Sequence, residues 1–318
     1  MYLSIYALKK HSLLILVLCI NPNICGFAQI KEHLVHNNYK RSYISYLPKT
    51  YSKDKQYPLV IVLHGGGGTA NQIMQNTRQR FNELADEEGF IVVYPNGIKK
   101  SWNDNPKRDT NGFARKKNID DVGFIKRLIE LLEHNYSINS DAIFACGISN
   151  GGLMSQTLAM ALPKKIKAIG MVASNFGSIQ IEGSKNTNPF SVLLIHGTTD
   201  PLFPYQEGQI GVFGKSRGLV LGIEKSIEHM CRLNGNDSIP VISSIEDNAA
   251  NDNCTSEHLI YPNSKTPNLK VELIKVTNGG HTWPGAKEQR LISRLVGNTT
   301  QDFDACDKLW GFFKSTLD

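Results

Sequence analysis

The sequence is poor in cysteine and has no long apolar segment. Six of its 318 residues are cysteines. No C-x-x-C or H-E-x-x-H spacing occurs, so the sequence predicts no metal site, and nothing in it calls for a cofactor. The apolar run Leu13–Ile20 is shorter than the roughly 20 residues that cross a bilayer, and we expect no stable membrane span.

The sequence also lacks a large excess of charge of either sign. The formal net charge is +6, and Lys9 and Lys10 lie in a segment that we expect to be removed. The remaining 33 basic residues against 29 acidic ones leave an excess of +4. Because this excess is mild and no basic helix is interleaved with aromatic residues, nucleic-acid binding is not expected.

Residues 1–28 have the three regions of an export signal. Lys9, Lys10 and His11 precede the apolar run, and Gly26-Phe27-Ala28 places small residues three and one positions before Gln29. A buried first strand or a short membrane anchor are the alternatives. We expect residues 1–28 to be cleaved, residues 29–318 to form the mature domain, and the protein to be secreted or periplasmic.

Four cysteines remain in the mature segment, namely Cys146, Cys231, Cys254 and Cys306. Cys146 lies in an apolar strand and is expected to be a small core residue. Cys231 and Cys254 flank a polar stretch. Since an exported protein can oxidise its thiols, we expect these two to pair, although sequence alone does not fix the connectivity.

Strands alternate with helices along the chain. Tyr57–Leu63 is a continuous apolar run, as is typical of a strand buried on both faces. The alternation predicts one α/β domain with a mostly parallel central sheet and helices on both faces. Residues 234–268 are polar and are left unassigned. The expected strands are 39–46, 57–63, 90–94, 142–147, 166–172, 191–196 and 269–276, and the expected helices begin at 71, 120 or 121, 151, 220 and 303.

A candidate nucleophile lies between a strand and a helix. Gly147-Ile148-Ser149-Asn150-Gly151 matches G-x-S-x-G, the motif of a sharp turn that projects a serine hydroxyl into a cleft. Five-residue matches also occur by chance as plain turns, but this one follows an apolar strand and opens a helix. We therefore predict Ser149 to be a nucleophile.

A serine nucleophile needs a base, and His281 is the candidate. It lies in a glycine-flanked loop after the last expected strand, within Asn278–Gly285. His64 and His196 also follow strands, but they come too early in the chain, and we expect them to pack at strand ends.

An imidazole base needs an acid that fixes its tautomer, and we select Asp200. It comes four residues after the strand that ends at His196. Asp120 and Asp121 are competing acids, but they precede Ser149 and are expected to cap a helix.

A developing oxyanion needs N–H donors. We expect the backbone of Asn150 to provide one and the loop His64–Gly68, at Gly66, to provide the other. No lysine follows these glycines at the position that a phosphate-binding loop requires, so that alternative is rejected.

With these residues placed, the chain resembles the secreted poly(3-hydroxybutyrate) depolymerase and feruloyl esterase relatives of the α/β-hydrolase fold. The matching segments include LHGGGG, GISNGGLM, HGTTDPLFPY and NGGHTWPG, and they span about 63–285. The order Ser149, Asp200, His281 is the one that this fold uses. The resemblance implies a serine esterase. No cysteine follows Asn234-Gly235, so a disulfide of the family cannot be carried over.

The ester substrate is less well defined by the sequence. Trp102 and Trp283 could wall a cleft and stack on a feruloyl ring, or they could be packing residues. A basic loop could favour an acidic polysaccharide, or it could be merely solvated; its cations are Lys99, Lys100, Lys107, Arg108, Arg115, Lys116 and Lys117.

We expect a feruloyl esterase-like enzyme that acts on ester substituents of plant cell-wall polysaccharide. Hydroxybutyrate-oligomer depolymerase and acetyl xylan esterase are the alternatives. A serine peptidase, or a catalytically silent binding module on the same fold, are alternatives of another class. The oligomeric state does not follow from the sequence.

Overall fold

The computed structural model describes residues 29–104, 112–177, 188–212, 215–287 and 293–317. Residues 1–28 lie outside the described residues, and the expected export signal and the domain boundary at residue 28 therefore stay predictions. Lys107 and Arg108 of the basic loop also lie outside them.

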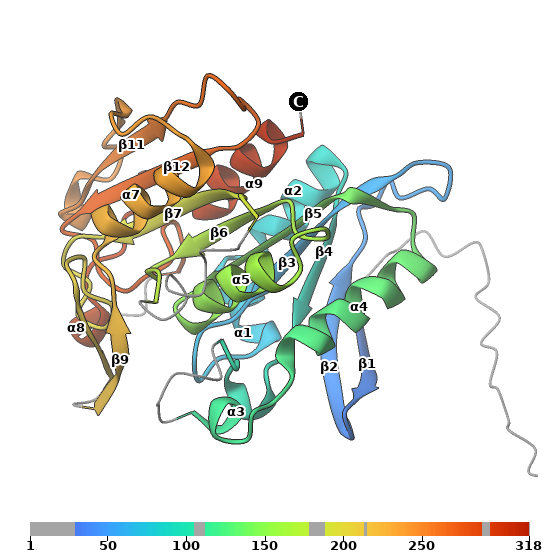
Figure 1. The fold of residues 1–318 in the computed structure, drawn as a ribbon. Helices are drawn as coiled ribbons and strands as arrows, with labels where there is room; N and C mark the ends of the chain where they lie inside the picture. Colours follow the sequence, from blue (N-terminus) through green and yellow to red (C-terminus); the bar gives the residue numbers. More distant parts are fainter. Residues whose placement is uncertain (1–28, 105–111, 178–187, 213–214, 288–292, 318) are drawn as a thin grey trace, which may run out of the picture.

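Ten of the described strands form one mixed sheet (Figure 1). Its order is β1-β2-β4-β3-β5-β6-β7-β12-β11-β10, in which the six central strands are parallel and two antiparallel strands flank them at each end. A separate hairpin pairs β8 with β9. The strands are β1 (Ile30–His36), β2 (Tyr39–Tyr46), β3 (Tyr57–Leu63), β4 (Ile91–Pro95), β5 (Ile138–Ile148), β6 (Ala168–Val172), β7 (Ser191–Gly197), β8 (Gly208–Val212), β9 (Lys215–Val220), β10 (Val241–Ile245), β11 (Thr255–Tyr261) and β12 (Val271–Thr277).

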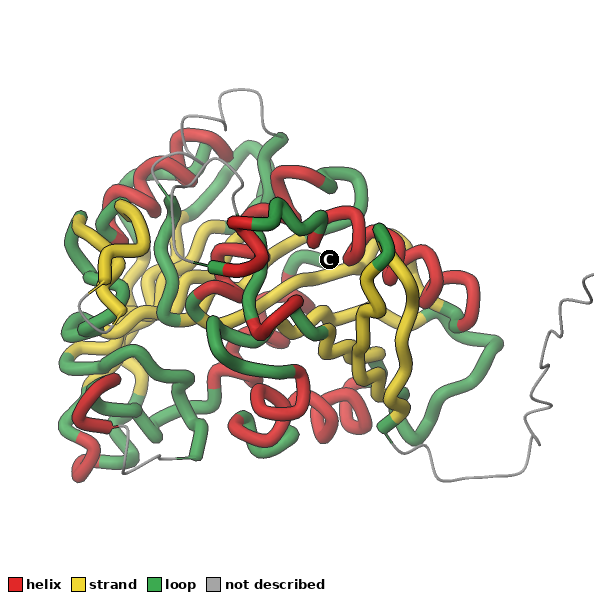
Figure 2. Tube along the Cα trace, turned by 90° about the horizontal axis from the view of Figure 1, so that it is seen from below, coloured by secondary structure: helices red, strands yellow, loops and turns green. Residues whose placement is uncertain are grey.

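Helices cover both faces of this sheet (Figure 2). In the segments that the structure describes, none of them combines the length and the apolar surface that a bilayer crossing requires. The helices are α1 (Ala70–Asn76), α2 (Arg80–Glu88), α3 (Phe113–Lys116), α4 (Asp121–Asn135), α5 (Asn150–Ala161), α7 (Ile223–Asn234), α8 (Ser293–Val296) and α9 (Ala305–Ser315), with 3₁₀ turns η1 (Ile98–Lys100) and η3 (Ala250–Asp252).

Two apolar cores lie on opposite faces of the sheet. We name them the α5-side core, which α4, α5 and α7 cover, and the α9-side core, which α1, α2 and α9 cover (Figure 1). Strand β3 divides its side chains between them. Leu59, Ile61 and Leu63 enter the α5-side core, whereas Val60 and Val62 enter the α9-side core. This two-sided burial explains the continuous apolar run in the sequence.

Local signals in the sequence set where several helices begin and end. The Asp120 carboxylate accepts a hydrogen bond from the Gly123 N–H at 2.8 Å and caps α4, as expected. In place of the single helix expected to begin at residue 71, the structure has two helices. Arg78 and Gln79 lie between them with positive φ angles of 53° and 59°, which no helix accommodates.

The predicted fold class is confirmed, with a mostly parallel sheet between two helical layers. Strand β1 and the β8–β9 hairpin were not predicted from the sequence. A helix was expected from residue 220, but Val220 ends β9 and α7 begins at Ile223. The unassigned stretch 234–268 contains β10 and β11, which extend the sheet at one edge.

The expected disulfide between Cys231 and Cys254 is wrong. All four cysteines of the described chain are free and buried. Cys231 points into the α5-side core and Cys254 into the α9-side core, so the sheet separates the two thiols. Burial raises the pKa of Cys231 to about 11 and that of Cys254 to about 12, which disfavours their reactive thiolates. Cys146 is a core residue, as predicted.

Because these thiols are free, we expect a reductant to leave the thermal midpoint unchanged. A disulfide joining Cys231 to Cys254 would contribute about 3 kcal/mol, and its reduction would lower the midpoint by several degrees. Thermal unfolding with and without dithiothreitol measures this difference. Alkylation of the unreduced, denatured protein followed by mass spectrometry provides the control, because both cysteines should carry the label.

Candidate active site

Four loops meet at one edge of the sheet, where the parallel strands β3, β5, β7 and β12 end. These loops carry the residues Gly66, Ser149, Asp200 and His281 that the sequence analysis selected. Gly66, Ser149 and His281 line a pocket of about 810 Å³. Because neighbouring parallel strands end on the same side, the topology brings together residues that are far apart in the sequence.

Ser149 lies on a strained turn between β5 and α5. Its φ of 57° and ψ of −121° are unfavourable for a residue with a side chain. The turn packs directly against the end of β3. A Cβ atom at Gly147 would lie 2.6 Å from the Leu63 carbonyl oxygen, and one at Gly151 would lie 2.7 Å from that of His64. Both flanking positions therefore require glycine.

Asp200 and His281 are hydrogen-bonded. The His281 Nδ1 atom lies 2.8 Å from Oδ2 of Asp200, whose side chain is fully buried. The other carboxylate oxygen accepts the backbone N–H groups of Leu202 and Phe203, each at 2.8 Å. These contacts fix the carboxylate, so it accepts a hydrogen bond from Nδ1–H and leaves Nε2 of the imidazole free of this bond.

The loop that carries His281 is tied to the loop that carries Asp200. The Thr199 hydroxyl donates to the Gly279 carbonyl at 2.9 Å, and the Asn278 N–H donates to the Thr198 hydroxyl at 2.9 Å. Phe203 stacks on the His281 ring, with centroids 5.4 Å apart and planes at 19°. These contacts hold the imidazole at the pocket wall.

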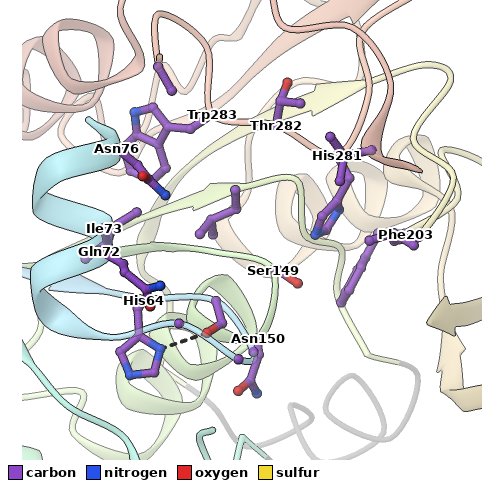
Figure 3. Close-up of a pocket in the computed structure, with 18 of the residues that line it drawn as sticks. His64, Gln72, Ile73, Asn76, Ser149, Asn150, Phe203, His281, Thr282 and Trp283 are labelled. Atoms are coloured by element: carbon purple, nitrogen blue, oxygen red, sulfur yellow. Dashed lines mark hydrogen bonds between the residues drawn. The ribbon is translucent and has the colours of Figure 1, made fainter. Parts of the chain in front are cut away.

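Ser149 and His281 face each other across the pocket. Figure 3 places the Ser149 hydroxyl between the His281 ring and Asn150. The hydroxyl is not hydrogen-bonded to the imidazole in this structure. Hydrogen bonds of this kind are often long until a substrate binds, so the arrangement remains compatible with proton transfer.

The glycine loop after β3 packs against the Ser149 turn. A Cβ atom at Gly66 would lie 3.8 Å from the Asn150 Cβ. The Gly67 N–H donates to the Lys100 carbonyl at 2.8 Å and the Gly68 N–H donates to the Gly65 carbonyl at 3.0 Å. The Gly66 N–H has no backbone acceptor within the described chain, and it is therefore available to a ligand.

His64 holds the start of this loop and does not face the pocket as a base. Its Nδ1 atom lies 2.7 Å from the Gly65 carbonyl (dashed line in Figure 3), and its Nε2 atom accepts the Gly97 N–H at 3.0 Å. Burial lowers the pKa of His64 to about 4, so the ring is neutral near pH 7. The packing role expected for this histidine is confirmed.

His196 also packs at a strand end. It is buried, its Nε2–H donates to the Phe203 carbonyl at 2.9 Å, and burial lowers its pKa. Its Nε2 atom lies 3.7 Å from Oδ2 of Asp200, and His196 is not among the described residues that line the pocket.

A buried polar network fixes the side chain of Asn150. Its Oδ1 atom accepts the Trp102 N–H at 2.8 Å, and its Nδ2 group donates to the Asp104 carboxylate at 2.9 Å. Arg115 forms two hydrogen bonds of 2.6 Å with the same carboxylate. Asp104 is completely buried and the Arg115 side chain is only 8% exposed. The pair therefore fixes the first residue of α5, whose N–H borders the pocket.

Both tryptophans border the pocket, and both are almost fully buried. Trp102 is 0% exposed and its indole N–H donates to the His64 carbonyl at 2.9 Å, so it packs the loop, and a substrate contact there stays a prediction. Trp283 is 3% exposed and lines the pocket beside Asn76, at the end of α1 (Figure 3). A substrate contact at Trp283 stays a prediction.

Phe203, Asp104 and the role of Arg115 were not predicted from the sequence. Phe203 lies in the PLFPY segment, where only its position three residues after Asp200 hinted at a role. Asp104 lies in a polar loop and carries no local sign of burial. The described residues contain no group of three or more histidine, cysteine or acidic side chains that could hold a metal ion.

The chain is similar to proteins named as esterases. Residues 37–190 match the family model described as "Putative esterase". The chain is 30% identical to "Putative esterase NocK" of Nocardia uniformis subsp. tsuyamanensis over 72% of its own length, and 29% identical to feruloyl esterase C of Emericella nidulans over 58%. Together these matches support a feruloyl esterase-like family of α/β-hydrolases for the chain.

These matches cover part of each protein. They span 66% of the NocK chain and 64% of the Emericella enzyme, so the chain spans slightly less than two thirds of the curated relatives it matches. The family-model match includes Ser149 and ends before Asp200 and His281.

Solved structures agree on the esterase fold. An acetyl xylan esterase from Aspergillus awamori matches with a TM-score of 0.58 at 14% identity, over 90% of this chain and 99% of that one. A ferulic acid esterase from Anaeromyces mucronatus, solved with ferulic acid, matches with a TM-score of 0.50 at 18% identity, over 65% of this chain and 80% of that one. At these identities the likeness shows the fold alone.

Replacement of Asp104 by alanine should destabilise the protein strongly. The substitution removes the carboxylate from a buried guanidinium and from the Asn150 amide, which should cost about 3–5 kcal/mol. Urea unfolding measures the loss. The partly exposed pair between Glu133 and Lys165 provides the control, since Glu133→Ala should cost under about 1 kcal/mol. Equal losses in the two variants would contradict the importance of the network.

His64 should make the domain sensitive to acid. An unfolded histidine takes up a proton near its ordinary pKa of 6.5, whereas the buried ring does so only near pH 4. Stability is therefore full above pH 6.5 and falls as the pH drops toward 4. Between pH 7.5 and 5 this group should account for about 2 kcal/mol of the loss.

The variant His64→Gln tests this assignment, because it cannot be protonated. Its stability at pH 7.5 should be lower than that of the wild type, but its further loss at pH 5 should be smaller by about 2 kcal/mol. Chemical unfolding at both pH values gives the two differences. The exposed residue His134 provides the control as His134→Gln. A pH dependence unchanged by His64→Gln would refute the assignment.

Proposed function

We propose that the protein is a serine carboxylic-ester hydrolase whose catalytic residues are Ser149, Asp200 and His281. The observation that supports this most directly is the buried Asp200 carboxylate bonded to Nδ1 of His281, with the ring facing Ser149 (Figure 3). The match to an esterase family model supports the same conclusion.

The proposed mechanism is acyl transfer through a covalent intermediate. Nε2 of His281 accepts the Ser149 proton as the hydroxyl oxygen attacks the ester carbonyl, and Asp200 stabilises the imidazolium. The N–H groups of Gly66 and Asn150 donate to the oxyanion, and the amino end of α5 adds a favourable dipole. The imidazolium protonates the leaving alcohol. Water that His281 activates then releases the acid and restores the serine.

The proposed substrate is a feruloyl-type ester linked to plant cell-wall polysaccharide. Relatives named feruloyl esterase C support this choice, and the pocket volume of about 810 Å³ can hold an aromatic acyl group together with part of a sugar. Acetyl xylan and hydroxybutyrate oligomers are the alternative esters. Turnover of methyl ferulate, acetylated xylan and hydroxybutyrate oligomers, measured side by side, separates the three.

We place the enzyme outside the cytoplasm because residues 1–28 have the composition of an export signal.

A peptidase would use the same three residues, so matched ester and amide substrates distinguish the two activities. A silent binding module would not react with a fluorophosphonate.

Replacement of Ser149 by alanine should abolish ester hydrolysis. Without the nucleophile, kcat on methyl ferulate should fall by about 10⁴-fold or more, because only oxyanion stabilisation and binding remain. Fluorophosphonate labelling should disappear with it. Circular dichroism and the thermal midpoint should stay close to wild type, since alanine tolerates the strained turn as well as serine does. Wild-type turnover by this variant would disprove the assignment of the nucleophile.

A further inference from the structure

Lysine side chains dominate the charge of the pocket. Among the described residues that line it, the cationic ones are Lys99, Lys100, Arg115 and Lys287, and the acidic one is Asp252. All three lysines are exposed to solvent. The lining therefore carries more positive than negative charge, although the whole chain is only mildly basic.

The arginine and the acid of this lining are already engaged, whereas the lysines are not. Arg115 is bonded to the buried Asp104 carboxylate. One oxygen of Asp252 accepts the Cys254 N–H at 2.8 Å and the other accepts the Gln301 N–H at 2.7 Å. Within the described chain, none of the three lysines forms an ion pair, so their charges are available to a ligand.

The backbone at two of these lysines is strained. Lys99 and Lys100 have positive φ angles of 49° and 60°, which residues other than glycine and asparagine rarely adopt. A glycine at either position would relieve this strain, yet the chain has lysine at both. Strain of this kind concentrates at functional sites, where the surrounding structure maintains it.

The strained turn is attached to the glycine loop. The Lys100 carbonyl accepts the Gly67 N–H at 2.8 Å, one residue beyond the proposed oxyanion donor Gly66. His64 accepts the Gly97 N–H at 3.0 Å at the start of the same turn. Lys287 is anchored separately, since its N–H donates to the Asn76 carbonyl of α1 at 3.2 Å. These bonds hold the turn that carries Lys99 and Lys100, and the backbone at Lys287, in fixed positions beside the pocket.

We propose that Lys99, Lys100 and Lys287 form a subsite that binds a carboxylate of the substrate beyond the ester bond. This inference rests on the proposed function. Since that function places a polysaccharide ester in the pocket, the carboxylate that fits is that of a uronic acid residue in the carbohydrate. An ammonium group attracts a carboxylate more strongly in a partly enclosed pocket than on an open surface.

Matched ester pairs test the subsite and locate the carboxylate. For the alcohol side, the probes are 4-acetoxybenzoate and its neutral counterpart 4-acetoxybenzamide. For the acyl side, they are the mono-4-nitrophenyl ester of adipic acid and 4-nitrophenyl hexanoate. The measured quantity is the ratio of kcat/KM for the charged probe to that for the neutral probe.

The test variant is Lys99→Gln with Lys100→Gln, and the control is Lys116→Gln with Lys117→Gln. Lys116 and Lys117 are exposed but do not line the pocket, so the control makes the same change in net charge. For the alcohol-side pair we expect the ratio to fall about three- to tenfold in the test variant, to fall less in Lys287→Gln, and to stay near wild type in the control. In the wild type, 0.5 M salt should lower this ratio.

Three outcomes would overturn the subsite. The first is an unchanged ratio in the test variant. The second is an equal fall in the control, which would indicate steering by net charge. The third is an effect confined to the acyl-side pair, which would contradict a carboxylate on the carbohydrate. Binding is measured separately by calorimetry with trigalacturonate on Ser149→Ala, with and without the two lysine substitutions. If the wild type hydrolysed no ester but the lysine substitutions weakened trigalacturonate binding, the proposed function would fail and the subsite would stand.

Discussion

The site depends on the close approach of two backbone segments, the turn at Ser149 and the end of β3. Glycines at 147 and 151 allow this approach, because a Cβ atom at either position would overlap a carbonyl oxygen of Leu63 or His64. The contact sets the glycine loop beside Asn150 and leaves the Ser149 hydroxyl directed into the pocket. The strain at Ser149 persists because the parallel strands β3 and β5 hold both segments in register.

Polar side chains buried around this contact hold the loops that the sheet does not hold. Asn150 is bonded to the backbone of Trp102 and to Asp104, and Arg115 closes the network from α3. On the other side, backbone N–H groups and His281 surround the Asp200 carboxylate. Buried charges are costly unless each finds a partner, so these networks restrict the loops to few arrangements. The precision of the site thus comes from satisfied polar groups as well as from the apolar cores.

The sequence predicted the sheet centre and the candidate residues because their signals are local. An apolar run such as Tyr57–Leu63 indicates a buried strand by itself, and the G-x-S-x-G motif needs only five residues. The features that it did not predict depend on distant partners. Arg78 and Gln79 interrupt a helix without proline or glycine. Nothing in the polar loop at Asp104 indicates that its carboxylate is buried and bonded to Asn150. The two cysteines expected to pair are separated by the sheet itself, which no spacing rule reveals.

The same division explains why chemistry is easier to infer than substrate. The groups proposed to act on the ester follow strand ends, where backbone geometry constrains which residues fit. The lysine turn, by contrast, joins the glycine loop through main-chain groups of the turn. These are the Lys100 carbonyl, which accepts the Gly67 N–H, and the Gly97 N–H, which His64 accepts. Side chains at positions 99 and 100 can therefore change without disturbing the oxyanion donors. A fold built in this way can keep one reaction while its loops select among esters, because the constraint on the reacting groups does not extend to the side chains at the pocket mouth.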